Sequence, residues 1–337
     1  MELTLHTVFP EDLQDEWNAL LEESTAHVPF LRHEYLRIWW QTRGGGEWPQ
    51  AELAIVTARQ QGRLVGIAPL FVATPPRGQP ALLLLGSIEI SDYLDLIARP
   101  ADLEPFLAEL LPFLQQAQLP AWHRLDLYNV LESSPTLPAL ERAARQQGWG
   151  FDLQRLQRSP YITLPGDWEA YLAGIDKKQR HEVRRKMRRA TELNPPARWY
   201  LTSDPQRLEE DISAFLELMR HEEDKAAFLT EAMQTHMRLT IRCAFENGCL
   251  NLAFLEVDGQ KACGYLSFDY LNRIWVYNSG MDPRYKDYSP GWVLLGHLLQ
   301  WANENGREML DFMRGNEEYK YRFGATDRFV MRATLHP

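Results

Sequence analysis

The amino-acid sequence predicts an α/β protein in which each half of the chain forms a mixed, mostly antiparallel sheet flanked by helices. Two observations support this fold class. Strand-like and helix-like segments alternate along the chain, and the second half repeats the order of the first. The length of 337 residues also suits two domains. We therefore expect two tandem domains of similar fold.

The clearest sign of a duplication is a strand followed by a Pro-initiated helix. Residues 3–9 alternate like a strand, and Pro10 then begins an amphipathic helix. Residues 199–203 and Pro205 repeat this arrangement 195 positions later. The apolar faces of the two helices consist of Leu13, Trp17, Leu20 and Leu21 in the first copy and Leu208, Ile212, Phe215 and Leu216 in the second. The alternative is a chance likeness between two α/β units.

Hairpins and later elements continue the repeat. Residues 53–72 predict a hairpin that turns at Gln61-Gly62, and residues 251–270 predict one that turns at Asp258-Gly259. In the first half a helix at 103–116 is followed by a strand at 124–127. In the second half a helix at 292–305 is followed by a strand at 309–312. We place an N-terminal domain at residues 1–160, a connecting segment at 161–196 and a C-terminal domain at 197–337.

Composition narrows the class of protein. Apolar residues make up 45% and charged residues 24% of the chain, as in ordinary globular proteins. We expect a cytoplasmic protein without a membrane span. No apolar run is long enough to cross a bilayer, and the acidic N-terminus resembles neither a signal nor a transit peptide. The three cysteines lack the spacing of metal ligands, and we expect them to be reduced thiols. No motif indicates a zinc site or nucleoside triphosphate chemistry.

A polar loop in the second half predicts an anion site. Residues 274–278 form a predicted strand, and residues 279–289 lead from it into the helix at 292–305. Ser289 suits the N-cap and Pro290 the first helical position. The start of such a helix presents free N–H groups and the positive end of the dipole. The loop could therefore hold a pyrophosphate.

This order of strand, small-residue loop, helix, strand and tyrosine-bearing segment resembles the acyl-CoA-binding core of the GCN5-related N-acetyltransferases (GNAT). In that superfamily the loop reads Arg/Gln-x-x-Gly-x-Gly/Ala. Lys286, Ser289 and Gly291 stand at the matching positions, so lysine replaces the arginine and serine the first glycine. The resemblance implies that acetyl-CoA or another acyl-CoA is the donor substrate. It assigns the contacts with this donor to Lys286, Ser289, Pro290, Gly291 and Trp292.

Further short motifs resemble the cellulose-biosynthesis-type (BioF2-like) acetyltransferases and the FemABX double-domain transferases. They are the basic run at 177–190, Tyr288–Gly291, Leu310–Phe312, Gly315–Lys320, Phe323-Gly324 and, in the first half, Ser91–Asp95. The resemblance implies two tandem GNAT-like (acyl-CoA N-acyltransferase) domains. The first half has Ile97–Pro100 where the second has its small-residue loop. We therefore expect the first domain to shape the acceptor site and the second to bind the donor.

Direct acyl transfer needs a base for the acceptor and an acid for the leaving thiolate. The chain has no Gly-x-Ser-x-Gly elbow and no evident Cys–His pair, which favours direct transfer over a covalent intermediate. The resemblance places Tyr319 as the acid, with aromatic packing as the alternative. The candidate bases are Asp95, Asp269, Asp311 and Glu318. For Asp311 the alternative is a buried ion pair with Arg314 or Lys320.

The acceptor side is less defined. Candidate substrate contacts are Asp92, Asp95, Arg180, Arg184 and Lys320. The acceptor is an amine or hydroxyl of a sugar, an amino acid, a peptide or a lipid precursor. The alternative functions are a FemABX-like transferase that uses aminoacyl-tRNA and a degenerate GNAT protein that binds without catalysis.

The basic run KKQRHEVRRKMRRA at residues 177–190 raises a separate question. It has eight cations and one glutamate, a net +7 in a chain of −10, so the remainder carries −17. That background opposes extensive nucleic-acid binding. The run predicts a helix with a narrow apolar seam at Val183, Met187 and Ala190. Its charge could be neutralised by the acidic clusters at 209–211 and 222–224, by substrate or CoA phosphates, by transfer RNA or by an anionic membrane.

Overall fold

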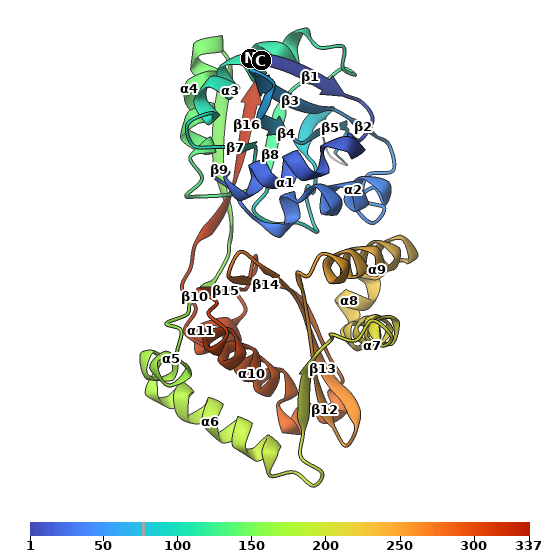
Figure 1. The fold of residues 1–337 in the computed structure, drawn as a ribbon, viewed down its shortest axis with the longest axis vertical. Helices are drawn as coiled ribbons and strands as arrows, with labels where there is room; N and C mark the ends of the chain where they lie inside the picture. The colour runs from blue at the N-terminus through green and yellow to red at the C-terminus, as the bar shows by residue number, and fades with distance from the viewer. Residues whose placement is uncertain (76–77) are drawn as a thin grey trace. The chain divides into compact units, whose positions relative to one another are not determined.

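The structure, a computed structural model, describes residues 1–75 and 78–337. The chain forms two compact units (Figure 1). Unit 1 contains Met1–Gln157 together with Arg328–Pro337, and unit 2 contains Arg158–Asp327. The last strand therefore returns to the unit that contains the N-terminus.

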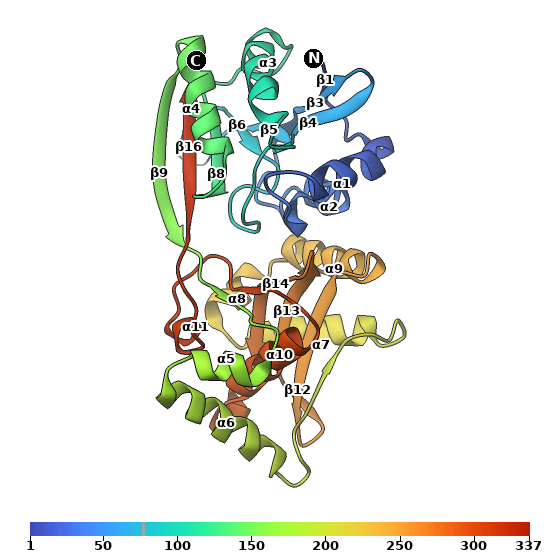
Figure 2. The same ribbon diagram turned by 60° about the vertical axis from the view of Figure 1, so that its left-hand side comes forward.

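In unit 1 the described residues form two sheets and four α-helices. Its helices are α1 (Gln14–Glu22), α2 (His33–Gln41), α3 (Leu103–Gln116) and α4 (Thr136–Gln147). Its strands are β1 (Glu2–His6), β2 (Ala51–Leu53), β3 (Ile55–Gln60), β4 (Arg63–Ala68), β5 (Leu70–Ala73), β6 (Ala81–Leu84), β7 (Ile97–Ala98), β8 (Leu125–Leu131), β9 (Gly150–Arg158) and β16 (Phe329–His336). The sheet orders are β1-β3-β4-β7 and β2-β5-β6-β8-β16-β9. Figure 2 shows β16 between β8 and β9.

Unit 2 has one six-stranded sheet in the order β10-β15-β14-β13-β12-β11. Its strands are β10 (Tyr161–Thr163), β11 (Arg198–Leu201), β12 (Leu250–Val257), β13 (Gln260–Tyr270), β14 (Arg273–Met281) and β15 (Met309–Asp311). Its helices are α5 (Trp168–Gly174), α6 (Lys177–Thr191), α7 (Leu208–Arg220), α8 (Glu223–Phe228), α9 (Glu231–Glu246), η3 (Pro283–Tyr288), α10 (Pro290–Glu304) and α11 (Glu318–Arg322). The β14–β15 pair is parallel and the other pairs of this sheet are antiparallel.

The predicted fold class is confirmed, and so is the repeated order of elements. The run β1-β3-β4-β7 of unit 1 corresponds to β11-β12-β13-β14 of unit 2. In both units a helix follows the first strand, and a longer helix precedes the parallel strand, α3 before β8 and α10 before β15. Each unit is thus an α/β arrangement with a mixed sheet.

The unit boundaries differ from those expected from the sequence. The segment 161–196 is part of unit 2, because β10 pairs with β15 and α6 packs against α10. Residues 328–337 belong to unit 1, because β16 pairs with β8. Both differences arise from hydrogen bonding between strands that are far apart in sequence, which local patterns do not reveal.

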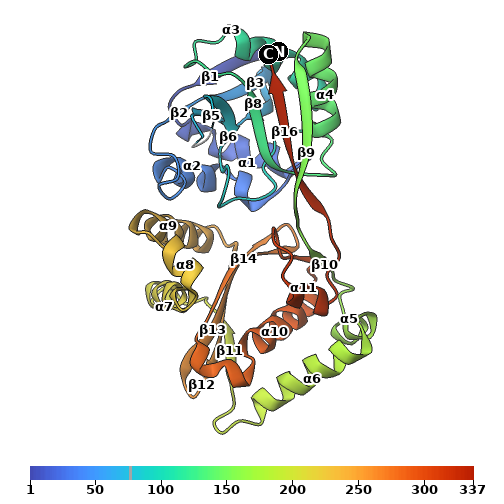
Figure 3. The same cartoon turned by 180° about the vertical axis from the view of Figure 1, so that it is seen from behind.

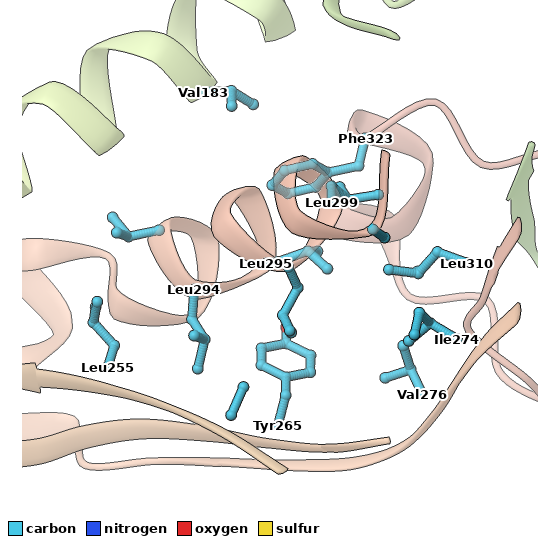
Figure 4. Packing of buried hydrophobic residues seen from close by; sticks show 14 of the residues in the cluster. Val183, Leu255, Tyr265, Ile274, Val276, Leu294, Leu295, Leu299, Leu310 and Phe323 are labelled. Atoms are coloured by element: carbon cyan, nitrogen blue, oxygen red, sulfur yellow. The ribbon is translucent and has the colours of Figure 1, made fainter. Parts of the chain in front are cut away.

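Helix α10 packs against one face of the unit 2 sheet, and α7 packs against the other. Figure 3 shows α10 and α6 on one side of β12–β14 and α7, α8 and α9 on the opposite side. In Figure 4, Leu294 and Leu295 of α10 point toward the sheet, where the ring of Tyr265 lies beneath Leu295. This buried cluster continues to Leu299 and Leu310.

The predicted apolar seam of the basic helix is confirmed. Val183 and Ala190 are buried, and Met187 packs against the same core. A Cβ atom at Gly296 of α10 would lie 2.8 Å from the Met187 sulfur, so a side chain at this position would displace the Met187 side chain. The glycine thus allows α6 and α10 to approach closely.

A buried carboxyl group in unit 1 makes the stability of that unit dependent on pH. Asp95 is 1% exposed, and its carboxylate accepts hydrogen bonds from the Ser134 hydroxyl and the Leu96 N–H. Burial raises the pKa of Asp95 to about 6, although hydrogen bonds from Ser134, Thr136 and Leu96 oppose the shift. Ionisation of Asp95 therefore costs the folded state stability as pH rises through this value.

We predict that Asp95→Asn changes the pH profile of unfolding. The free energy of unfolding of the wild type, relative to the variant, should fall by about 2 kcal/mol between pH 4 and pH 7, because the folded pKa exceeds the unfolded one by about two units. Urea denaturation at a series of pH values measures this difference. Asp224→Asn, at an exposed position, is the control. A difference between wild type and Asp95→Asn that stays constant with pH would contradict the prediction.

Candidate active site

A pocket of about 370 Å³ lies in unit 2, where β13, β14, the start of α10 and α11 meet. Its lining includes four of the five residues expected to contact the donor, together with Tyr319. The residues of the wall are Lys186, Glu222, Cys263, Tyr265, Ser279, Gly280, Met281, Lys286, Ser289, Gly291, Trp292, Leu295, Tyr319, Arg322 and Phe323.

The loop between β14 and α10 forms one side of the pocket. Pro290 is the first helical residue, as predicted, and it is buried. Ser289 occupies the N-cap position, but it does so in the left-handed conformation (φ 53°) and its hydroxyl makes no capping bond. The expected serine side-chain cap is therefore wrong. Instead, the backbone carbonyl of Ser289 accepts from the N–H groups of Trp292 and Val293 at 3.0 and 3.1 Å.

Gly291 leaves the pocket open at the start of α10. A Cβ atom at this position would have the Cys263 sulfur at 3.9 Å and no closer neighbour, so a longer side chain could extend into the pocket. The Gly291 N–H precedes the N–H groups of Trp292 and Val293 and lies before the regular hydrogen bonds of the helix begin. Together with the helix dipole, this N–H favours an anion in the pocket.

Three cationic side chains lie around the same wall. They are Lys286 of η3, Lys186 of α6 and Arg322 of α11. The Lys186 ammonium lies 4.1 Å from the centre of the Trp292 ring, a cation–π contact. The Trp292 Nε1–H is buried and has no hydrogen-bond acceptor among the described residues. This wall therefore offers positive charge and a free donor to a ligand with phosphate or carbonyl oxygens.

Two tyrosines form the inner part of the pocket. Tyr265 of β13 is 5% exposed, and its hydroxyl donates a hydrogen bond to the phenol oxygen of Tyr319 on α11. Burial raises the pKa of both phenols above the usual range, and nearby charges add to the shift. Both groups are therefore protonated near neutral pH. Tyr319 also packs edge-on against Phe312, with ring centres 5.9 Å apart, so its aromatic packing accompanies its place in the pocket wall.

The pocket wall also contains one carboxylate and one thiol. Glu222, the residue before α8, is the only acidic residue in the wall among the described residues, and its carboxylate accepts a hydrogen bond from the Lys225 ammonium at 2.9 Å. Cys263 is 1% exposed, and burial raises the pKa of its thiol to about 12. A thiol that stays protonated is a poor nucleophile. This arrangement suits direct transfer better than a covalent cysteine intermediate.

The remaining candidate acids and bases lie outside the pocket wall. Asp269 forms an ion pair and two hydrogen bonds with Arg307. Asp311 is buried in β15, and one of its oxygens accepts from the N–H of Met313 at 2.8 Å. Glu318 is exposed and paired with Arg322 at 2.6 Å.

The candidate substrate contacts also have other partners. Asp92 and Asp95 are buried inside unit 1. In unit 2, Arg180 donates to the carbonyl oxygens of Leu172 and Ala173 at the end of α5, and Arg184 is paired with Glu169. Lys320 is 3% exposed. Its ammonium donates to the carbonyls of Phe312, Arg314 and Gly315, which holds the segment between β15 and α11 in place.

Sequence reasoning did not identify Tyr265, Glu222, Lys186, Arg322 or Cys263 as members of the site. Alternation along β13 places Cys263 and Tyr265 on one face of the sheet, and this signal was present in the sequence. Because both faces of β13 are apolar, the pattern does not show which one meets α10. The contributions of α6, of α11 and of Glu222 before α8 depend on packing between distant segments.

A comparison with protein families finds a likeness over the segment that contains most of this pocket. Residues 177–321 match the family of GNAT acetyltransferase domains. The matched segment begins at the basic helix α6, ends within α11 and covers less than half of the chain. Nearly all of the pocket wall falls inside it.

Solved structures extend the likeness to the whole chain. The crystal structure of FemX is 12% identical, covers 99% of this chain and 97% of its own, and has a TM-score of 0.69. A conserved protein of unknown function from Bacteroides thetaiotaomicron VPI-5482 is 13% identical over the full length of both chains, with a TM-score of 0.64. The C-terminal domain of a putative lysylphosphatidylglycerol synthetase from Agrobacterium fabrum is 10% identical, covers 94% of this chain and 92% of its own, and has a TM-score of 0.53. At these identities the likeness concerns the fold alone.

No curated protein matches the sequence. Across residues 1–75 and 78–337, no helix has the length and apolar character needed to cross a membrane. Within the same residues, no cluster of three or more metal-ligating side chains is present.

We predict that Ser289→Gly stabilises unit 2. Serine in the left-handed region costs about 1 kcal/mol relative to glycine, so the free energy of unfolding should rise by about that amount. Thermal or urea unfolding measures the change. Ser213→Gly, at an exposed interior position of α7, should instead destabilise by up to about 1 kcal/mol. If both variants shift stability in the same direction, the backbone explanation for Ser289 is wrong.

Proposed function

We propose that the GNAT domain binds an acyl-CoA and transfers its acyl group directly to an amine or hydroxyl of a small-molecule, saccharide or peptide acceptor. One observation carries this proposal. A single pocket combines the N-terminus of α10, three cations and a pair of protonated tyrosines. The BioF2-like motifs, among them Tyr288–Gly291, belong to the same proposal.

The polar wall suits the pyrophosphate and pantetheine of CoA. The Gly291 N–H, Lys186 and Lys286 can hold phosphate oxygens, as at other helix N-termini. The Trp292 Nε1–H can donate to a carbonyl or phosphate oxygen. When bound, an acyl-CoA supplies an acyl thioester as the group to be transferred.

The inner wall supplies the acid and the base. Tyr319 holds a proton on its phenol oxygen, and this proton can pass to the sulfur as the carbon–sulfur bond breaks. Tyr265 donates a hydrogen bond to that same oxygen, which stabilises the phenolate left behind. Glu222 can accept the proton that the acceptor loses as its nitrogen or oxygen bonds to the acyl carbon.

The first test is donor binding. Acetyl-CoA should raise the unfolding temperature of the protein, because a ligand that binds only the folded state stabilises it. Lys286→Ala combined with Gly291→Glu should abolish this shift without unfolding the protein, since the glutamate places a negative charge in the pocket. The matched control is Lys178→Ala with Gly174→Glu, which makes the same change in charge at two exposed positions outside this pocket.

Two results would overturn this assignment. Retention of acetyl-CoA binding in the double variant would show that the loop is not the donor site. A wild-type protein that ignores acyl-CoA but is stabilised by aminoacyl-tRNA would favour a FemABX-like function instead.

The second test concerns Tyr319. Tyr319→Phe should bind acetyl-CoA as the wild type does but lose roughly 10²- to 10⁴-fold in turnover, because the variant lacks the proton for the leaving thiolate. Acetylated products from a panel of amines and amino sugars, detected by mass spectrometry, provide the assay. Tyr321→Phe on the same helix, whose hydroxyl contacts Asp327, is the control. Equal turnover in the two variants would remove Tyr319 from the mechanism. An acetyl-CoA complex without any product would favour a binding protein.

A further inference from the structure

The outward surface of α6 carries positive charge that has no role in the proposed reaction. We define the basic face of α6 as Lys177, Lys178, His181, Arg184, Arg185, Arg188 and Arg189, all of which are exposed. The apolar residues Val183, Met187 and Ala190 lie on the opposite side, against the core. A helix of 15 residues is about 22 Å long, so the basic face is a continuous cationic strip of about four turns.

The chain itself neutralises this strip only in part. Glu169, Glu182 and Glu192 pair with Arg184, Arg185 and Arg188 respectively. Among the described residues, no acidic side chain forms an ion pair with Lys177, Lys178 or Arg189. Like charges three and four residues apart on a helix repel one another. An external anionic partner would therefore stabilise this surface.

Most of the acidic residues that could have neutralised α6 pair with other cations. Glu209 pairs with Arg242, and Lys261 pairs with both Glu210 and Asp211. Glu222 pairs with Lys225 and lies in the pocket wall. Among the described residues, neither cluster forms an ion pair with a cation of α6.

The basic face of α6 belongs to a helix that also contributes to the wall of the proposed donor pocket. Lys186, on the same helix, lies in the pocket wall and contacts Trp292. Helix α6 also packs beside η3, which contributes Lys286. A macromolecule docked on the basic face of α6 would thus lie next to the wall that we assign to the phosphates of the donor.

We infer that the acyl donor is presented by an acidic carrier protein, an inference that rests on the proposed function. Such a carrier holds its acyl group as a phosphopantetheine thioester, the same reactive arm as in CoA. An acidic helix on the carrier would complement the basic face of α6. The arm could then enter the pocket past Lys186.

Other anionic partners fit the strip less well. The basic face of α6 has no Phe, Tyr or Trp side chain for base stacking, and the −17 charge of the remaining chain repels a long polyanion. It also has no exposed apolar side chain to insert into a bilayer, because Val183, Met187 and Ala190 are packed inward.

The test compares the wild type with a variant of α6 in their affinity for a fluorescently labelled acetyl-holo-acyl carrier protein. Fluorescence anisotropy measures this affinity at 50 and 300 mM salt. Lys177→Glu, Lys178→Glu and Arg189→Glu are combined in one variant. This variant should bind the carrier at least tenfold more weakly at low salt, and its acetyl-CoA affinity should be unchanged. The control reverses three exposed cations of unit 1, Arg63, Arg142 and Arg145, which gives the same change in net charge.

The results separate this inference from the proposed function. Equal carrier affinity in the wild type and the α6 variant would overturn the carrier proposal. The carrier proposal would also be overturned if the wild type bound transfer RNA or phosphatidylglycerol vesicles more tightly than the carrier, and if the α6 variant lost that binding. Acetyl-CoA binding, measured on the same samples, tests the donor pocket separately, because the three substituted residues lie outside its wall. Circular dichroism and the unfolding midpoint confirm that the variant is folded.

Discussion

The packing of α10 against the unit 2 sheet determines where the site forms. Leu294 and Leu295 hold the helix against the face of the sheet that carries Tyr265. This contact places the first turn of α10 beside Tyr265 and Tyr319, so the start of the helix and both phenols share one pocket. The apolar contact therefore controls the geometry of the polar site.

Two further contacts bring α6 and α11 to the pocket, in addition to the packing of α10 on the sheet. The close approach at Gly296 and Met187 brings α6 onto α10, and Lys186 then reaches the Trp292 ring. The buried ammonium of Lys320 binds the carbonyls between β15 and α11, which positions the short helix that carries Tyr319. A substrate-binding role is thus not needed to account for Lys320.

The two units have the same order of elements but differ at the position of the donor loop. In unit 2 the polar segment after β14 leads into the open first turn of α10. In unit 1 the corresponding helix α3 follows Ile97–Pro100, and nearby carboxylates such as Asp95 are buried and hydrogen-bonded. The two units therefore share the order of their strands, while the polar loop that opens into a pocket is a feature of unit 2.

The sequence by itself determined the fold class, the repeat, the helices α6 and α10 and most of the donor loop, because these depend on local periodicity and on residues such as Pro290 and Gly291. It did not distinguish Asp269 and Glu318, which are paired with arginines, from Glu222, which lies in the pocket wall. Tertiary structure alone decided the partner of each charge, the return of β16 to unit 1 and the meeting of Tyr265 with Tyr319. Each of these contacts joins segments that are far apart in the chain, and their pairing follows from packing, which no local pattern encodes.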